Sequence, residues 1–173
     1  MKLFSVTFFL CVPLIWGAPD DFVKVDLEDK TLYLSKIKRN FYEAMEACKA
    51  EGLILASLEK PKQSDQFTDK GCEAIGITTE QRKVIVWLGL YRFEDGSFRY
   101  LDGFRAPSFF KWNYNEPNNW GTEWCVSAEC HLGKWFTMGC KQNLHFACQS
   151  PIGFMDALPG APQEGIPKAQ SEE

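Results

Sequence analysis

The sequence lacks the patterns that mark several classes of metal and catalytic sites. It has only two histidines, His131 and His145, and no Cys-x-x-Cys pair, which argues against structural zinc. Neither histidine has acidic or cysteine neighbours at triad spacing, so we expect one at the surface and one satisfied within a strand. A Gly-x-Ser-x-Gly motif and a phosphate-binding loop are also missing. We therefore expect a binding protein and not an enzyme.

The chain also lacks an excess of positive charge and a long apolar run. Its formal net charge is -4, with 19 basic and 23 acidic residues. Nucleic acids and anionic membrane surfaces select a clustered basic face, so neither is expected as a partner. A membrane-spanning helix needs roughly 20 apolar residues, and no stretch reaches that length. We expect no membrane insertion.

The apolar residues that open the chain are typical of a secretory signal peptide. Lys2 precedes an apolar run from Leu3 to Ile15, and the small residues Gly17 and Ala18 follow it. We predict a signal peptide over residues 1–18, a secreted, extracellular protein, and cleavage near Gly17 or Ala18. Residues 151–173 are rich in proline, glycine and acids, so we expect a disordered tail. One domain, residues 19–150, lies between them.

The cysteines indicate a disulfide framework. Removal of the signal peptide takes Cys11 with it and leaves an even set of six. An even set in a secreted chain implies disulfide bonds, although the spacing does not determine which cysteines pair.

The remaining pattern predicts an α+β domain. Asn40 and Glu43 form a capping pair that begins a helix, which Gly52 ends. A second helix is expected over 61–72. The dense apolar run 84–90 is typical of a core strand, and a turn at 94–97 leads into a hairpin strand at 98–100. Residues 104–124 form a long loop, followed by strands at 126–128, 134–136 and 144–147. Long ordered loops usually carry function.

These features, in this order, resemble the C-type lectin domain, in particular the short secreted single-domain lectins of insects. The resemblance covers nearly the whole domain. It rests on Glu43-Ala44-Met45-Glu46-Ala47-Cys48, Leu55-Ala56-Ser57-Leu58, Val86-Trp87-Leu88-Gly89-Leu90, Glu116-Pro117-Asn118, Trp124-Cys125-Val126, Gly133-Lys134-Trp135, Cys140 and Phe146-Ala147-Cys148. It implies an α+β fold with two helices, two small antiparallel sheets and a long structured loop.

The resemblance also implies which cysteines pair. It joins Cys48 to Cys148, which ties the first helix to the last strand, and Cys125 to Cys140, which braces the loop. Cys72 and Cys130 fall outside this plan. They can pair with each other, join a second chain or remain free. A bond to a second chain would give a homo- or hetero-oligomer.

A calcium-dependent sugar site is the second implication of the resemblance. Glu116, Asn118 and Glu123 match positions that bind both the ion and the sugar hydroxyls, and Glu-Pro-Asn is the mannose-type order. The resemblance further implies a cis Glu116–Pro117 bond when the loop is loaded. Trp120 can pack on a sugar ring, or it can anchor the loop against Trp112 or Trp124, and the sequence leaves both open.

Two departures weaken the expected calcium site. Phe136 and Thr137 stand where the family has an asparagine and an aspartate, so an anionic ligand is lost and we expect weak or absent calcium binding. Arg92 and Trp124 replace the acids of an auxiliary calcium site.

Two functions follow, and the sequence keeps both. In the first, the protein is a secreted lectin of mannose type, weakly calcium-dependent, that binds microbial or host glycans or glycoproteins in innate recognition. In the second, it is a calcium-independent lectin-like module that binds a protein partner such as a haemostasis factor or a receptor.

Overall fold

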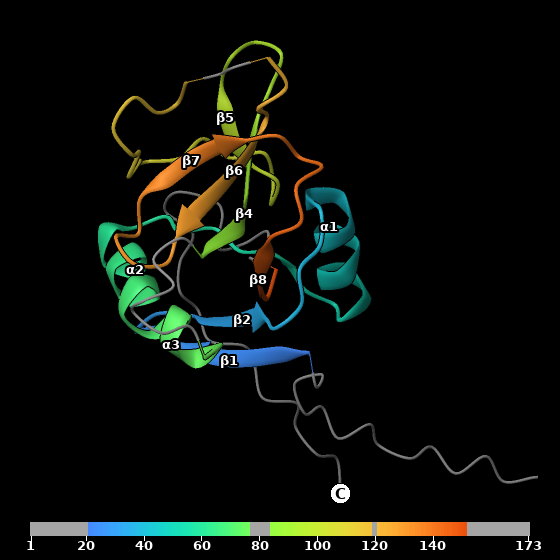
Figure 1. Ribbon diagram of the computed structural model, residues 1–173, viewed down its shortest axis with the longest axis vertical. Helices are drawn as coiled ribbons and strands as arrows, with labels where there is room; N and C mark the ends of the chain where they lie inside the picture. Colours follow the sequence, from blue (N-terminus) through green and yellow to red (C-terminus); the bar gives the residue numbers. More distant parts are fainter. Residues whose placement is uncertain (1–20, 77–83, 119–120, 152–173) are drawn as a thin grey trace, which may run out of the picture.

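The fold combines two helical segments with a mixed β-sheet (Figure 1). In the computed structural model, the described residues are 21–76, 84–118 and 121–151. The predicted signal peptide and almost all of the predicted tail lie outside them. Within these ranges, no helix combines the length and the apolar character that a membrane span requires. The α+β class predicted from the sequence is confirmed.

The first helix begins as the capping pair predicts. Helix α1 spans Phe41–Ala50; the Asn40 side chain accepts a hydrogen bond from the Glu43 N–H, and the Glu43 carboxylate accepts one from the Asn40 N–H. The second segment is less regular. It comprises α2 (Pro61–Gln66), a π-helical turn (Phe67–Gly71) and α3 (Cys72–Ala74), so the helix expected over 61–72 is interrupted. In Figure 1, α1 and α2 lie on opposite sides of the strands.

Eight strands form the sheet in the described part of the chain. Their bounds are β1 Phe22–Asp26, β2 Thr31–Ser35, β3 Ile54–Leu55, β4 Ile85–Arg92, β5 Phe98–Tyr100, β6 Cys125–Glu129, β7 Trp135–Met138 and β8 His145–Gln149. The strand order is β1-β2-β8-β4-β6-β7, with β3 paired to β8 and β5 to β4. The hairpin of β4 and β5 matches its prediction, with Leu90 opposite Tyr100.

The two antiparallel sheets expected from the resemblance are joined into one. One part contains β1, β2, β3 and β8, and the other contains β4, β5, β6 and β7. Strand β8 runs parallel to β4, pairing Val86 with His145 and Trp87 with Phe146. This pairing closes a long stretch of chain, and local sequence patterns do not reveal it.

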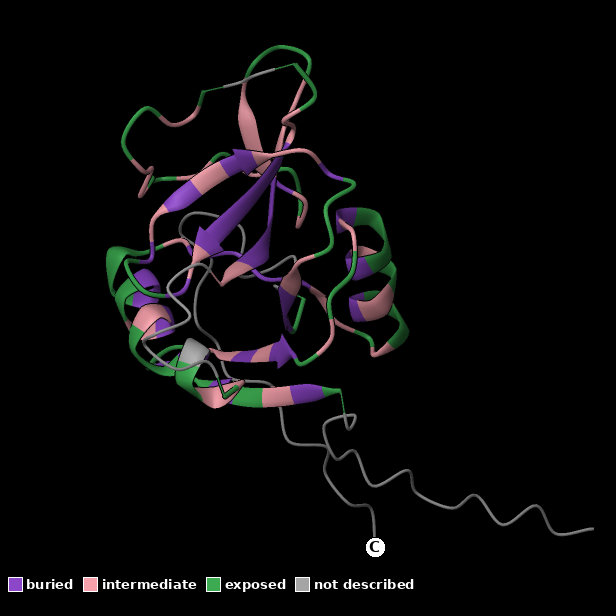
Figure 2. Ribbon diagram, in the orientation of Figure 1, coloured by how far each residue is buried: buried purple, intermediate pink, exposed green. Residues whose placement is uncertain are grey.

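Most residues of β4 and β8, which meet at this junction, are buried (Figure 2). Trp87 and Phe146 are fully buried, and Phe41 of α1 packs edge-on against Trp87 with ring centroids 5.5 Å apart. The Trp87 indole N–H donates to the Arg39 carbonyl at 3.1 Å. The core therefore holds α1 against the strands that carry the loop end of the domain.

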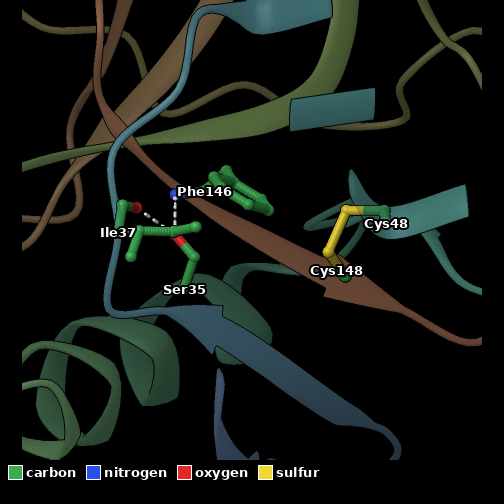
Figure 3. The surroundings of a disulfide bond; sticks show 5 residues. All are labelled: Ser35, Ile37, Cys48, Phe146 and Cys148. Carbon is green, nitrogen blue, oxygen red and sulfur yellow. Dashed lines mark hydrogen bonds between the residues drawn. A yellow bond between two sulfur atoms is a disulfide. The ribbon is translucent and has the colours of Figure 1, made fainter. Parts of the chain in front are cut away.

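A disulfide fixes α1 to the last strand. Cys48 and Cys148 are bonded with their Cα atoms 5.6 Å apart, and both side chains are fully buried. Beside them, the Ser35 hydroxyl donates to the Ile37 carbonyl at 2.7 Å and accepts from the Phe146 N–H at 3.0 Å (Figure 3). This end of the fold is thus held by both covalent and polar contacts.

A polar network supports the start of the long loop. Arg105 donates two hydrogen bonds to the Glu59 carboxylate, at 2.9 and 3.0 Å, and these hold the pKa of Glu59 below its ordinary value. The Lys30 ammonium donates to the Ser57 carbonyl and, at 3.0 Å, to the Gln149 side-chain oxygen. Burial lowers the pKa of Lys30 to about 8, although Glu59 favours its charged form.

We expect Lys30 to give the domain a measurable pH dependence. An unfolded lysine has a pKa of about 10.4, so between about pH 8 and 10 the unfolded chain binds more protons and stability rises with pH. For one proton, the slope is at most about 1.4 kcal/mol per pH unit. Above about pH 10 the trend reverses, because burial raises the pKa of Tyr100 and its phenol ionises mainly in the unfolded chain.

Urea unfolding at several pH values compares the parent with Lys30→Met. The rise between pH 8 and 10 should disappear in this variant and persist in Lys49→Met, which removes an exposed lysine of α1. Parallel profiles for the parent and Lys30→Met would show that Lys30 does not titrate in this range.

Candidate functional site

The long loop between β5 and β6 is anchored on aromatic side chains. Trp112 forms a β-bridge with Trp135 of β7, and the Asn113 N–H donates to the Trp135 carbonyl at 2.9 Å. Phe109 and Trp112 both pack on the Trp135 ring, with centroids 5.2 and 5.9 Å away. These contacts place the following residues, 116–118, beside β7.

The three predicted ligands converge on one hydroxyl group. The Thr137 Oγ1 lies 2.7 Å from Glu116 Oε2, 3.3 Å from Asn118 Oδ1 and 3.5 Å from Glu123 Oε2. The Thr137 N–H also donates to Glu116 Oε2, at 2.9 Å. The Asn118 amide donates to Glu116 Oε1 at 3.0 Å. The structure thus brings Glu116, Asn118 and Glu123 together around Thr137 of β7.

Thr137 does more at this site than the sequence analysis recognised. We treated it only as the loss of an aspartate, but it is a buried residue of β7 whose hydroxyl and N–H both bind Glu116. A signal was available: Thr137 lies two residues after Trp135, so both side chains share the face of the strand that meets the loop. One hydroxyl proton cannot be donated to three acceptors at once, so acceptor capacity remains at this point.

The other predicted site residues are placed less completely. Glu116–Pro117 is a cis peptide bond, as the resemblance implies. Phe136 is half-buried in β7 and precedes Thr137, so it points to the opposite face. Trp120 lies outside the described residues, and its two proposed roles stay open. Among the residues the structure describes, no cluster of three acidic, histidine or cysteine side chains is suited to a metal.

Arg92 and Trp124, which the resemblance places at an auxiliary calcium position, lie against each other. The Arg92 guanidinium sits 5.4 Å from the centre of the Trp124 ring, and the Arg92 N–H donates to the Trp124 carbonyl at 2.8 Å. Trp124 follows Glu123 directly in the sequence. Through Trp124, the pair is therefore next in sequence to the convergent site, the cluster of Glu116, Asn118 and Glu123 around Thr137. The positive charge of the Arg92 guanidinium would repel a metal ion at this auxiliary position.

The remaining cysteines and histidines take structural places. Cys125 and Cys140 are bonded, with Cα atoms 5.3 Å apart, at the end of the loop. Cys130 is also disulfide-bonded, so it is not a free thiol, but the Cys72 side chain lies outside the described part of the chain. His131 is exposed, and the His145 Nδ1 donates to the Ser35 carbonyl at 2.9 Å, as expected for a surface and a satisfied histidine.

Comparisons with known sequences identify related proteins. The sequence profile of the lectin C-type domain matches residues 37–150. The chain is 29% identical over 128 residues to collectin-11 of Bos taurus, a match that covers 72% of this chain and 44% of that protein. It is 28% identical over 104 residues to the C-type lectin mosGCTL-7 of Aedes aegypti, covering 56% of this chain and 63% of that protein. The chain thus spans less than two thirds of the length of either relative.

Solved structures share the fold. The mouse scavenger receptor C-type lectin carbohydrate-recognition domain superposes with a TM-score of 0.61 at 22% identity, covering 76% of this chain and 96% of that chain. The cow carbohydrate-recognition domain of CD23, solved in the presence of a GlcNAc2Man3 oligosaccharide, gives 0.60 at 23% identity, with coverages of 76% and 94%. With the domain profile spanning most of the described residues and the fold shared with these structures, the chain belongs to the C-type lectin domain family.

Proposed function

We propose that this domain is a secreted carbohydrate-binding lectin whose site is formed by Glu116, Asn118 and Glu123. The observation that carries the proposal is the convergence of their side-chain oxygens on the Thr137 hydroxyl. Two carboxylates held this close repel each other, which costs free energy. A ligand that accepts their lone pairs would offset that cost. The protein accordingly acts by binding and not by catalysis.

The chemistry of the groups suits a sugar with neighbouring hydroxyls. A glutamate carboxylate accepts a hydroxyl proton, while an asparagine amide donates to a hydroxyl oxygen. Glu116 and Asn118 offer this pair side by side, in the mannose-type order. Trp120 is proposed to pack on the apolar face of the sugar ring. The structure of the CD23 domain with a mannose-containing oligosaccharide is consistent with this ligand class for the fold.

Calcium fits the donor set, but weakly. All the groups that converge here are oxygens, as a hard cation requires, and Glu116, Asn118 and Glu123 would hold it. When bound, the ion supplies positive charge that orients the sugar hydroxyls. Only two of the donors are anionic, and Thr137 contributes a neutral hydroxyl, so we expect affinity on the order of millimolar or weaker.

Weak single sites suggest how the lectin would act. A monovalent sugar contact gains useful strength only when several sites engage one surface, so we propose recognition of multivalent microbial or host glycans. Assembly of several copies would provide that valency. The predicted signal peptide over residues 1–18 is consistent with this role outside the cell.

Glycan-array binding tests the proposal. The parent in millimolar calcium should bind mannose-type glycans, and chelator should remove that binding. Glu116→Gln and Glu123→Gln should bind at least about tenfold more weakly, since each loses a charged contact. Glu46→Gln, an equal charge change on the exposed face of α1, should bind like the parent. Equal binding by Glu116→Gln and the parent would refute this site.

One observation favours the second candidate function. The Thr137 hydroxyl and N–H both donate to one oxygen of Glu116, so contacts within the chain support the shape of the loop at this point. Such a loop could present a calcium-independent surface to a protein partner, such as a haemostasis factor or a receptor. This second function would be supported if the parent binds no glycan on the array and melts at the same temperature in calcium and in chelator.

A further inference from the structure

A pocket separate from the convergent site opens beside the end of β4. Its volume is about 600 Å³, and neither Glu116 nor Asn118 lines it. Two arginines, two acids and three aromatic rings form its walls: Tyr91, Arg92, Phe93, Glu94, Asp95, Arg99 and Trp124. Aromatic surfaces together with charged groups can bind a ligand that has both an apolar face and a charge.

Arg92 is the unusual residue of this pocket. Its Nε is buried and has no hydrogen-bond partner. Among the described residues, no carboxylate lies within ion-pairing distance of its guanidinium, whereas Arg99 pairs with Asp95 and Arg105 pairs with Glu59. A buried charged donor without an acceptor costs free energy, and such groups in native proteins usually have a partner. An anionic ligand in the pocket, which Arg92 lines as a partly exposed residue, would offset this charge.

The acids of the pocket do not supply this acceptor. The Asp95 carboxylate accepts hydrogen bonds from the Ser97 N–H at 2.9 Å and from the Ser97 hydroxyl, and it pairs with Arg99. These contacts lower the pKa of Asp95, the Ser97 hydroxyl contributing most, and they keep the carboxylate engaged in its own turn. Glu94 is exposed to solvent. Arg92 therefore remains the available positive group of the pocket.

The aromatic walls indicate what carries the anion. The Tyr91 and Trp124 rings are nearly parallel, with centroids 6.5 Å apart and an interplanar angle of 19°. Aromatic faces of this kind pack on the C–H face of a sugar ring. Trp124 also follows Glu123 directly in the sequence, so neighbouring residues contribute to this pocket and to the convergent site.

We propose that the Arg92 pocket binds the carboxylate or sulfate group of an acidic saccharide. The guanidinium donates to the anionic oxygens, and the Trp124 and Tyr91 rings support the sugar. The preference for an anion rests on Arg92 alone, whereas the choice of a saccharide rests on the proposed function. The pocket thus selects acidic over neutral glycans.

Three matched disaccharides test this selection, ending in glucuronic acid, in 6-sulfated glucose and in glucose. Affinities are measured by NMR titration of the parent in chelator, which removes any calcium-dependent contribution. At least one acidic form should bind about tenfold or more tightly than the neutral form, as expected for a charge-assisted hydrogen bond, and added salt should weaken it. Comparison of the two acidic forms distinguishes carboxylate from sulfate.

Variants assign the effect to Arg92. Arg92→Met keeps an unbranched apolar side chain for packing on Trp124 and should lose the acidic preference, while Arg92→Lys should keep part of it. Lys24→Met, the same charge change on β1 at the far end of the sheet, should keep all of it (Figure 1). An unchanged preference in a folded Arg92→Met protein would overturn the proposal.

Failure here and failure of the proposed function give different results. Glu116→Gln should abolish chelator-sensitive binding of neutral mannose and leave the acidic preference intact. If the parent shows no chelator-sensitive mannose binding but does show the Arg92-dependent preference for acidic disaccharides, only the calcium-dependent sugar site is refuted. Binding of inorganic sulfate without binding of either acidic disaccharide would overturn the saccharide assignment.

Discussion

The double substitution Phe136→Asn and Thr137→Asp should tighten calcium binding by at least about tenfold, because the aspartate replaces the neutral Thr137 hydroxyl with an anionic ligand. In the parent, the Thr137 hydroxyl lies within hydrogen-bond reach of Glu116, Asn118 and Glu123. A carboxylate at position 137 would therefore face the same three oxygens. Chelator-sensitive binding to mannose-type sugars should strengthen with it.

The same change should make stability depend on calcium. In the parent, the Thr137 hydroxyl donates a hydrogen bond to Glu116. An ionised aspartate cannot donate one, and it would bring a third negative charge beside Glu116 and Glu123. Without metal, the double variant should therefore melt below the parent, and calcium should raise its melting temperature much more than the parent's. Differential scanning calorimetry in calcium and in chelator measures both effects.

Two controls separate metal binding from simple repacking. Thr137→Val removes the hydroxyl with little change in shape and should lower stability without creating calcium dependence. Glu116→Gln in the double variant should reverse most of the gain. If the double variant binds calcium no better than the parent, Glu116, Asn118 and Glu123 do not form a partial ion site, and the calcium-independent function becomes the better account.

Removal of the disulfide between Cys48 and Cys148 should have the largest effect on stability. The bond joins residues separated by 100 positions, for which chain entropy gives a loss of about 4.7 kcal/mol in the double alanine variant. The bond between Cys125 and Cys140 spans 15 positions and should cost about 3 kcal/mol. Loss of the two buried sulfur atoms of Cys48 and Cys148 adds a packing cost.

For glycan binding we expect the opposite order: loss of the Cys125–Cys140 bond should weaken binding more than loss of the Cys48–Cys148 bond. Cys125 lies two residues after Glu123, so its loss should loosen the convergent site and weaken glycan binding more than the loss of Cys48 and Cys148 does in protein that remains folded. Urea unfolding and glycan binding of both double alanine variants provide the comparison. Equal destabilisation, or a larger loss for the Cys125 pair, would contradict the chain-entropy argument.

Local patterns predicted much of the fold, and the exceptions have physical causes. The capping pair of Asn40 and Glu43, the apolar strand β4 and its hairpin with β5 each depend on neighbours in sequence. The two-residue strand β3 and the parallel pairing of β4 with β8 depend on distant contacts. The hairpin of β1 and β2 was not predicted, although Val25, Leu32 and Leu34 occupy its buried positions.

The candidate site shows the same division. Glu116, Asn118 and Glu123 were identified by their resemblance to a family pattern, and Arg92 and Trp124 were recognised only as departures from it. The hydrogen bonds of Thr137 to Glu116 and the buried Arg92 Nε depend on how the loop meets β7 and β4. No sequence pattern contains that geometry, because the participants are separated in the chain by about 20 residues or more.

The most direct test of the central claim is the calcium affinity of the parent, measured by titration calorimetry with and without saturating mannose. If Glu116, Asn118 and Glu123 hold calcium and sugar at one site, mannose should tighten calcium binding by the same factor by which calcium tightens mannose binding. We predict a calcium dissociation constant on the order of millimolar that falls when mannose is present. Calcium binding that is absent, or that mannose leaves unchanged, would contradict the account.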